Sequence, residues 1–214
     1  TFNMQDTGVY PRGFKLTSSI PVVAYQFNLY ETIASASTDG SLLLPDHALY
    51  NQYYAMTYAG DGGGGSEPYL AIYAVDPDTE VTITPSADTS PSADDSATVV
   101  RRGTADQPFS VTLQPLDVLI VRGRSGSTDL TGSLITATGP VGLFGGNRAT
   151  QVPRGRTYRD HLEQQTFPRQ ALGTRYIVAK SRARGRPPIP DQVRVLADVD
   201  GVNIRFDPAL DGTA

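Results

Sequence analysis

Apolar and polar residues alternate over many short stretches of this chain. The segments VTIT (81–84) and SVTLQ (110–114) show the alternation most clearly, as expected of strands with one face on a core and one in water. The predicted strands are rich in β-branched or aromatic residues and are bounded by turn residues. They cover 14–18, 21–27, 53–59, 69–75, 80–85, 109–115, 117–122, 132–137, 140–146, 175–180, 192–198 and 202–206.

One segment, YRDHLEQQ (158–165), has a pattern that a helix can also adopt, and Pro153 and Pro168 limit such a helix to about two turns. Glycine (21 residues) and proline (16 residues) are abundant, which favours short strands joined by turns. The pattern and the composition together predict an all-β chain with antiparallel strands.

The chain repeats itself. Gly13–Asn28 aligns with Gly132–Asn147 at an offset of 119, and ALYNQYYAM (48–56) aligns with ALGTRYIVA (171–179) at an offset near 122. The match continues from VDPDTEVTI (75–83) to ADVDGVNIRF (197–206) with a one-residue gap. A unit of about 120 residues that recurs in the same order indicates an array of modules. We therefore predict tandem antiparallel β-sandwich-like modules, in which PVVAYQFN (21–28) and PVGLFGGN (140–147) are equivalent core strands.

The repeat also predicts the division of the chain. Residues 1–40 are expected to end a preceding β module. Residues 41–150 are expected to form a complete module, and residues 151–214 to start the following, incomplete module.

Three segments resemble the tandem β modules of the IgGFc-binding protein family: GSLITATGPVGLFGGN (132–147) followed by VP (152–153), DHLEQQTFPRQALGTRYIV (160–178), and STDGSLLLP (37–45). The family usually has a Cys soon after the GxN strand and another directly before the Asp-His pair, where this chain has Ala149 and Arg159. The resemblance implies secreted or surface proteins that bind other macromolecules. Because both cysteines are missing, the loop 148–159 is expected to be held by other means.

Charge and cysteine content limit the partners and the kinds of site that the chain can have. Residues 1–100 hold twelve acidic and two basic residues, whereas residues 101–214 hold sixteen basic and ten acidic ones. This polarity suits contact between the acidic part of one module and the basic part of the next. Nucleic-acid binding is disfavoured because the net charge is −4 and no nucleic-acid module is recognised. The absence of cysteine excludes disulfides, thiolate metal sites and Cys nucleophiles, and no apolar run is long enough for a membrane-spanning helix.

An Asp-His pair, Asp160 and His161, is the one segment that suggests catalysis, since a carboxylate can orient an imidazole as a general base. Adjacent residues point in different directions on a strand or a helix, and no nucleophile elbow accompanies them. We therefore predict that the protein is not an enzyme, and that His161 and Glu163 fix the loop, with Glu163 paired to Arg159 or Arg169.

Two pairs of carboxylates lie at matching points of the two repeats: Asp76 with Asp78, and Asp198 with Asp200. Carboxylate oxygens can bind calcium, but Asp, Pro and Gly are also the residues of tight turns. We favour turns and predict no metal or cofactor, with calcium as the alternative.

The candidate binding residues are Tyr53, Tyr69, Arg154 and Arg156. Tyrosines cluster between 50 and 73, where their rings form either a platform for carbohydrate or protein contact or the interior of a sandwich. The two arginines belong to the basic region 148–186.

These patterns together predict a non-enzymatic structural or adhesive protein, extracellular or on the cell surface, with head-to-tail self-assembly into a homo-polymer as the hypothesis. The alternative is a monomeric binding module for glycan or protein ligands. The expected partners are other copies of the protein, or surface proteins and glycans.

Overall fold

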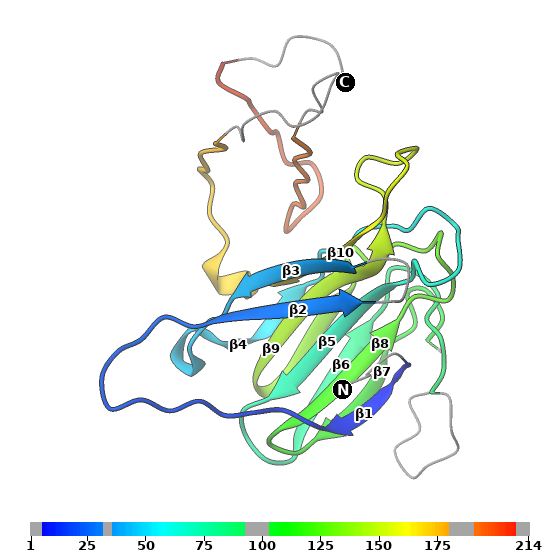
Figure 1. The fold of residues 1–214 in the computed structure, drawn as a ribbon. Coiled ribbons are helices and arrows are strands. Elements are labelled where there is room, and N and C mark those ends of the chain that lie inside the picture. The colour runs from blue at the N-terminus through cyan, green and yellow to red at the C-terminus, as the bar shows by residue number, and fades with distance from the viewer. Residues whose placement is uncertain (1–5, 32–35, 93–102, 180–190, 209–214) are drawn as a thin grey trace.

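The computed structural model describes residues 6–31, 36–92, 103–179 and 191–208 (Figure 1). Every pairing between the named strands is antiparallel, which confirms the all-β prediction. In the described ranges, no helix is long and apolar enough to cross a membrane. The strands are β1 (Gly8–Pro11), β2 (Tyr25–Glu31), β3 (Ala36–Leu42), β4 (Tyr50–Tyr54), β5 (Pro68–Ala74), β6 (Thr79–Thr84), β7 (Phe109–Leu113), β8 (Asp117–Arg122), β9 (Leu134–Thr150) and β10 (Asp160–Gln165), with two short 3-10 helices, η1 (Asp46–Ala48) and η2 (Arg169–Ala171).

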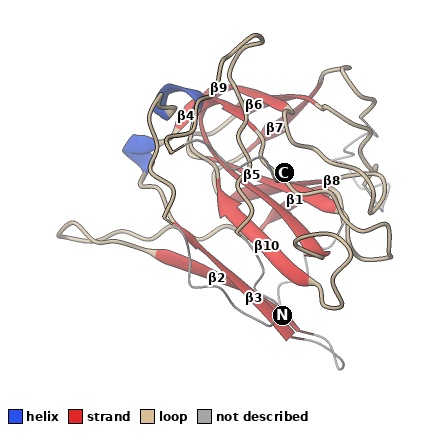
Figure 2. Cartoon of the chain, turned by 90° about the horizontal axis from the view of Figure 1, so that it is seen from above, coloured by secondary structure: helices blue, strands red, loops and turns tan. Residues whose placement is uncertain are grey.

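The long strand β9 organises the main sheet. Thr136 in its first part pairs with Thr82 of β6 and with Gln52 of β4, so these two strands lie on opposite edges of β9. The later part of β9 pairs with β5 and with β10. The sheet continues from β5 to β8 and β1, and from β6 to β7. Because β9 belongs to both groups of strands, the sheet bends along it into two layers (Figure 2).

The hydrophobic core fills the space between these layers. On β5, Leu70, Ile72 and Ala74 are buried while the residues between them are partly exposed. Successive side chains of a strand point to opposite faces, so this alternation places one face of β5 on the core. Val81 and Ile83 of β6 are fully buried in the same cluster. The period-two pattern seen in the sequence is therefore the pattern of these core strands.

A separate hairpin, β2–β3, repeats the geometry of β9–β10. Tyr25 of β2 pairs with Leu42 of β3, and Phe144 of β9 pairs with Gln165 of β10. The second pair follows the first by 119 residues on the first strand and by 123 residues on the second strand. The hairpin lies next to β10 in the fold (Figure 1). The internal repeat is thus visible as two hairpins with matching register.

The segment 158–165 does not form the short helix that its pattern allowed. Residues Asp160–Gln165 form β10, with His161, Glu163 and Gln165 buried and the residues between them more exposed. This period-two burial is decided by the edge of β9, which offers a partner for strand pairing. The partner lies elsewhere in the chain and was not visible in the local pattern.

Other strand predictions also need correction. Among the described residues after β10, none forms a strand, although strands were expected at 175–180, 192–198 and 202–206. Of the strands expected at 14–18 and 21–27, only residues 25–27 belong to a strand, β2. Val22 is 60% exposed, whereas Val141 in β9 is fully buried, so these two residues do not occupy equivalent environments.

The predicted module boundaries do not coincide with the boundaries of the sheets. The boundary at 40 falls inside β3, and β1, which precedes it, pairs with β8 of the main sheet. The boundary at 150 separates β9 from β10, its hydrogen-bonded partner. Residues 160–165 therefore complete the sheet formed by residues 50–150.

Candidate functional site

The contact between the hairpin β2–β3 and the edge strand β10 is built as a regular ladder. Side-chain oxygens of Ser37, Asp39 and Ser41 on β3 accept hydrogen bonds from three backbone N–H groups of β10. These belong to His161 (2.8 Å), Glu163 (2.7 Å) and Gln165 (2.7 Å), in that order. Because every second residue of a strand points to the same side, one face of β3 meets every second N–H of β10.

This ladder satisfies the outer edge of β10 without adding a strand to the sheet. The other edge of β10 is bonded to β9. The free N–H groups of an edge strand are a template for association with other chains. In this chain they are covered by hydroxyl and carboxylate oxygens of β3, so the contact combines strand-edge recognition with side-chain specificity.

The carboxylate of Glu163 lies at the centre of the contact. It accepts hydrogen bonds from Nε2 of Gln26 (3.0 Å), Nδ2 of Asn28 (2.8 Å) and the hydroxyl of Tyr69 (2.9 Å). Its side chain is only 6% exposed. A buried carboxylate is costly unless its oxygens are hydrogen-bonded, so the donors from β2 and β5 hold Glu163 in place.

The partners of Glu163 differ from those expected. Arg159 pairs with Asp61, with 2.6 Å between Nε and Oδ2, and Arg169 pairs with Asp198, with 2.5 Å between Nε and Oδ1. Neither arginine supplies the bond predicted to Glu163. The neutral amides of β2 take that role, because the fold brings β2 over β10.

His161 is held by hydrogen bonds to structural groups. Its Nδ1 lies 3.1 Å from the carbonyl oxygen of Arg148, and its Nε2 lies 3.4 Å from the hydroxyl of Tyr69. The rings of His161 and Tyr69 are stacked, with centroids 6.0 Å apart. The adjacent Asp160 is exposed and approaches the hydroxyl of Ser37. The imidazole on β10 thus contacts both Tyr69 of β5 and the backbone of β9.

Two tyrosines of β5 are kept in the neutral form. Burial, together with the charge of Glu163, raises the pKa of Tyr69 well above its ordinary value. Burial raises the pKa of Tyr73 to about 12, although a hydrogen bond from Gln165 acts in the opposite direction. Both phenols therefore remain protonated at neutral pH, and the hydroxyl of Tyr69 stays a donor to Glu163.

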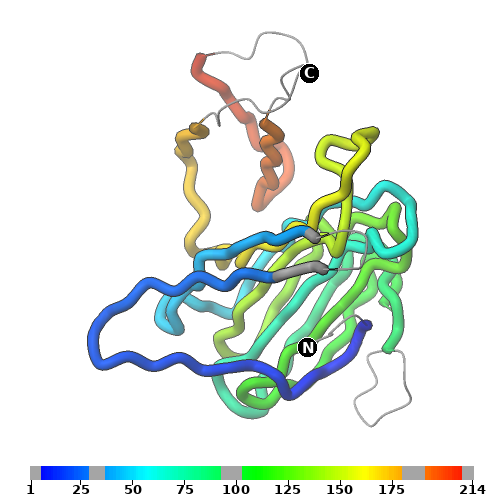
Figure 3. Tube along the Cα trace, in the orientation of Figure 1, coloured from blue at the N-terminus to red at the C-terminus, as the bar shows by residue number. Residues whose placement is uncertain are grey.

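A groove of about 1370 Å³ lies between the arm formed by residues 12–28 and the outer face of the sheet. Figure 3 shows the arm running past the sheet as a long extended trace. Tyr69, Tyr73 and Phe144 line the sheet side of the groove, and Glu163 and Arg148 line it as well. The groove therefore combines aromatic rings with charged groups, one of which is the Glu163 carboxylate of the hairpin contact.

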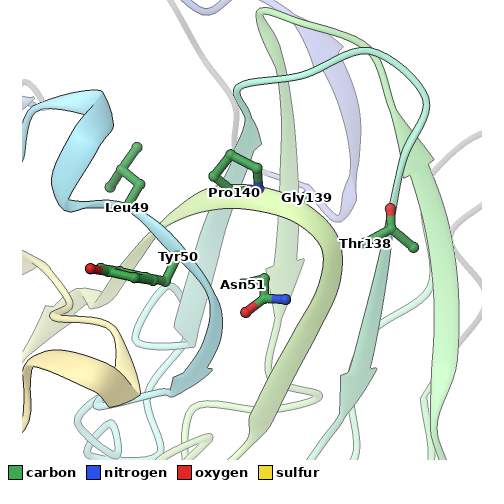
Figure 4. Close-up of a pocket in the computed structure, with 6 residues that line it drawn as sticks. All are labelled: Leu49, Tyr50, Asn51, Thr138, Gly139 and Pro140. Atoms are coloured by element: carbon green, nitrogen blue, oxygen red, sulfur yellow. The ribbon is translucent and has the colours of Figure 1, made fainter.

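A smaller hollow of about 250 Å³ lies where the start of β4 meets a bend of β9. Figure 4 shows that its six lining residues come from these two segments only. None of the six is an Asp, Glu, His, Lys or Arg residue. Its lining is Leu49, Tyr50, Asn51, Thr138, Gly139 and Pro140.

The structure does not bring the predicted binding residues together. Tyr53 is fully buried, and its hydroxyl donates to the carbonyl oxygen of Val141 (2.6 Å). This corrects the expectation of Tyr53 as an exposed platform, because packing between the two layers places its ring in the core. Tyr69 lines the groove, whereas Arg154 and Arg156 are exposed in the loop between β9 and β10.

Two of the four candidate calcium carboxylates, those of Asp78 and Asp198, have other partners. Asp78 lies in a turn with a φ of 52° and accepts a hydrogen bond from Nε2 of Gln114 (2.8 Å). The backbone carbonyl of Asp76 accepts a bond from the hydroxyl of Thr79, and Asp198 is paired with Arg169. Within the described part of the chain, no group of three or more His, Cys, Asp or Glu side chains is arranged to hold a metal ion.

Sequence reasoning missed the polar ladder. Its signal was the alternation of Ser37, Asp39 and Ser41 in a strand, which indicates one polar face. Such a face is usually solvated. Only the position of β10 shows that this one is a contact surface.

Comparison with known proteins gives consistent results. The sequence model of the family described as "IgGFc binding protein" matches residues 39–214. The human IgGFc-binding protein is 28% identical over 147 residues, which is 68% of this chain and 2% of the human protein. The chain thus spans a very small part of that relative. No solved structure matches.

Proposed function

The chain belongs to the IgGFc-binding protein family, and from this premise we propose that it is an extracellular or cell-surface binding protein without enzymatic activity. Its repeated β modules bind one another in series, which makes it a structural or adhesive protein. The human relative is named for binding the Fc part of IgG. For this chain we propose protein partners, and first among them modules of its own kind.

One observation carries the proposal: the hairpin β2–β3, which repeats β9–β10, is bound to β10 of the main sheet. The three bonds from β10 to Ser37, Asp39 and Ser41 form a contact between two successive repeat units. The buried Glu163 joins the same units through Gln26 and Asn28. One repeat unit therefore recognises the next through strand edges and a small polar centre.

The same contact repeated along a chain of such units gives an open array. A head-to-tail contact that does not close on itself generates a filament. The uneven charge favours this order, since the acidic first part of one unit meets the basic later part of another.

A second function, glycan or protein binding by a monomer, is favoured by the groove next to Tyr69. Aromatic rings with adjacent polar groups are common in binding sites, and Tyr69, Tyr73 and Phe144 line this groove together. In this reading the groove binds a ligand and the hairpin only supports its wall.

Light scattering coupled to size-exclusion chromatography tests the proposal. We expect the mass of the purified chain to rise with protein concentration, and to rise more at low salt than at high salt because complementary charges are screened by salt. A monomeric mass at every concentration and salt would contradict self-association. Glycan-array binding by the wild type that is lost in Tyr69→Ala, from a protein that stays monomeric, would support the second function.

A further inference from the structure

Two segments of the described chain expose an unusual number of large apolar side chains. One is the arm 14–27, and the other covers 176–178 and 193–206. Exposed large apolar side chains that follow one another closely along a chain point to an interaction site. The exposed residues include Leu16 and Val22 in the arm, and Tyr176, Val195, Ile204 and Phe206 in the second segment.

The arm corresponds to the central strand β9 of the complete module. The offset of 119 matches Leu16 to Ile135 and Val22 to Val141. Ile135 and Val141 are fully buried. The pairing of the hairpin β2–β3 supports this offset independently, because Tyr25 and Phe144 occupy the same place in their hairpins. The arm therefore carries core residues of a β9-type strand.

The second segment corresponds to β4, β5 and β6. The offset of 123, which relates β3 to β10, also matches Tyr53 to Tyr176, and Ile72 to Val195. It likewise matches Val81 to Ile204. Tyr53, Ile72 and Val81 are all fully buried in the complete module. The second segment thus carries the core residues of three strands without forming the strands.

In the complete module these strands are direct partners. β9 is hydrogen-bonded to β4, to β5 and to β6. The two exposed segments therefore contain complementary parts of one module. They are not paired with each other in this structure, and Figure 3 shows them leaving the main sheet in different directions.

We propose that the arm 14–28 of one copy pairs with residues 171–179 and 191–206 of a second copy, so that a β module forms between the two chains. This rests on the proposed function and names its partner surface. The register follows from the complete module: Ile72 pairs with Leu143 there, so Val195 of one copy lies opposite Ala24 of the other. Likewise Ile83 pairs with Ile135, so Phe206 lies opposite Leu16.

A second copy is the occupant because both halves of the module are present in this one sequence, and the two halves are not paired with each other within one chain. In the structure the second segment is bound to its own chain through polar contacts that include Arg194 with Asp129 and Asp198 with Arg169, and Arg194 also lies over the ring of Tyr58. Its apolar side chains are left for the partner.

Cysteine crosslinking tests the register, because the chain has no cysteine of its own. Two single variants of the full chain, Ala24→Cys and Val195→Cys, are mixed and oxidised. Directly opposite residues of antiparallel strands have Cα atoms about 4.5–5.5 Å apart, which suits a disulfide. The matched control replaces Val195→Cys by Leu196→Cys, the next residue, whose side chain points to the other face of the strand.

We expect the mixed disulfide dimer of Ala24→Cys with Val195→Cys to form about tenfold faster than the dimer with Leu196→Cys. Equal rates for the two mixtures would overturn the proposal. So would a double variant, Ala24→Cys with Val195→Cys, that closes within one chain while the mixture gives no dimer. Self-association by light scattering without register-specific crosslinking would overturn this inference alone, whereas a monomer at every concentration would overturn the proposed function as well.

Discussion

The guanidinium of Arg159 is bound to the carboxylate of Asp61, with 2.6 Å between Nε and Oδ2. This pair ties the end of the β9–β10 loop to the glycine-rich segment that begins at Asp61. The same guanidinium bonds the carbonyl oxygen of Gly64 and occupies the space that a Cβ on Gly63 would need. The glycine run thus gives the arginine room to dock.

Replacing Arg159 by Ala is expected to loosen the β9–β10 loop and the glycine run. The pair is partly exposed, with side chains 38% and 10% accessible, so we expect the free energy of unfolding to fall by about 1 kcal/mol. Amide hydrogen exchange should become faster across residues 60–66. Arg124→Ala, which removes the more exposed pair with Asp88, is the control. Unchanged exchange in the glycine run would show that Arg159 does not order it.

The side-chain ladder predicts a clear difference between neighbouring residues of β3. In Asp39→Ala the N–H of Glu163 loses its acceptor, and an unsatisfied buried donor costs about 1–3 kcal/mol. We expect the hairpin to detach, which limited proteolysis of residues 25–42 would detect. Thr38→Ala, at an exposed neighbouring position, should leave the cleavage rate unchanged. Equal protection in both variants would contradict the ladder.

Asp129 makes the stability of the chain sensitive to acid. Burial alone would raise its pKa, but hydrogen bonds from Thr131 and Thr57 and the charge of Arg194 outweigh burial and lower the pKa. The unfolded-state pKa is about 3.9. A folded-state pKa below that value means that the contribution is complete above pH 4–5 and is lost as the pH falls through the folded-state pKa, by linkage.

We therefore expect unfolding free energies measured by urea titration to fall between about pH 5 and pH 2. Asp129→Asn should reduce the slope of this dependence, because it removes a group that binds protons differently in the two states. Asp117→Asn, which removes a different carboxylate of the chain, is the control, and the pH dependence of its unfolding free energy is measured in the same way. An identical slope in Asp129→Asn and the wild type would mean that Asp129 does not contribute.

Tyr53 should act as a core residue. Its hydroxyl donates to the carbonyl oxygen of Val141 and accepts from the N–H of Tyr50. Tyr53→Phe removes both bonds from a fully buried site, so we expect a loss of about 1–3 kcal/mol in thermal or urea unfolding. Tyr50→Phe, whose side chain is exposed, should have little effect. Loss of ligand binding by Tyr53→Phe at unchanged stability would argue for a role at the surface.

The candidate site was only partly visible in the sequence. The alternation of VTIT (81–84), in β6, identified a core strand because one face of this strand lies on the core. Tyr69 was also selected as a binding residue and does line the groove. Tyr53 was predicted to bind together with Tyr69 and has the same side chain, but it lies in the hydrophobic core. A period-two pattern shows which residues share a face of a strand, but it does not show which face meets solvent.

The strand class, the family and the internal repeat could be read from the sequence, since these depend on local periodicity and on residue matches along the chain. The tertiary structure decided that residues 160–165 are a strand and that Glu163 is bound by Gln26 and Asn28. Those outcomes depend on partners that are far away in the chain, such as Asn28, 135 residues from Glu163. Hydrogen bonds and burial are properties of the neighbours that folding brings together, and local sequence does not specify them.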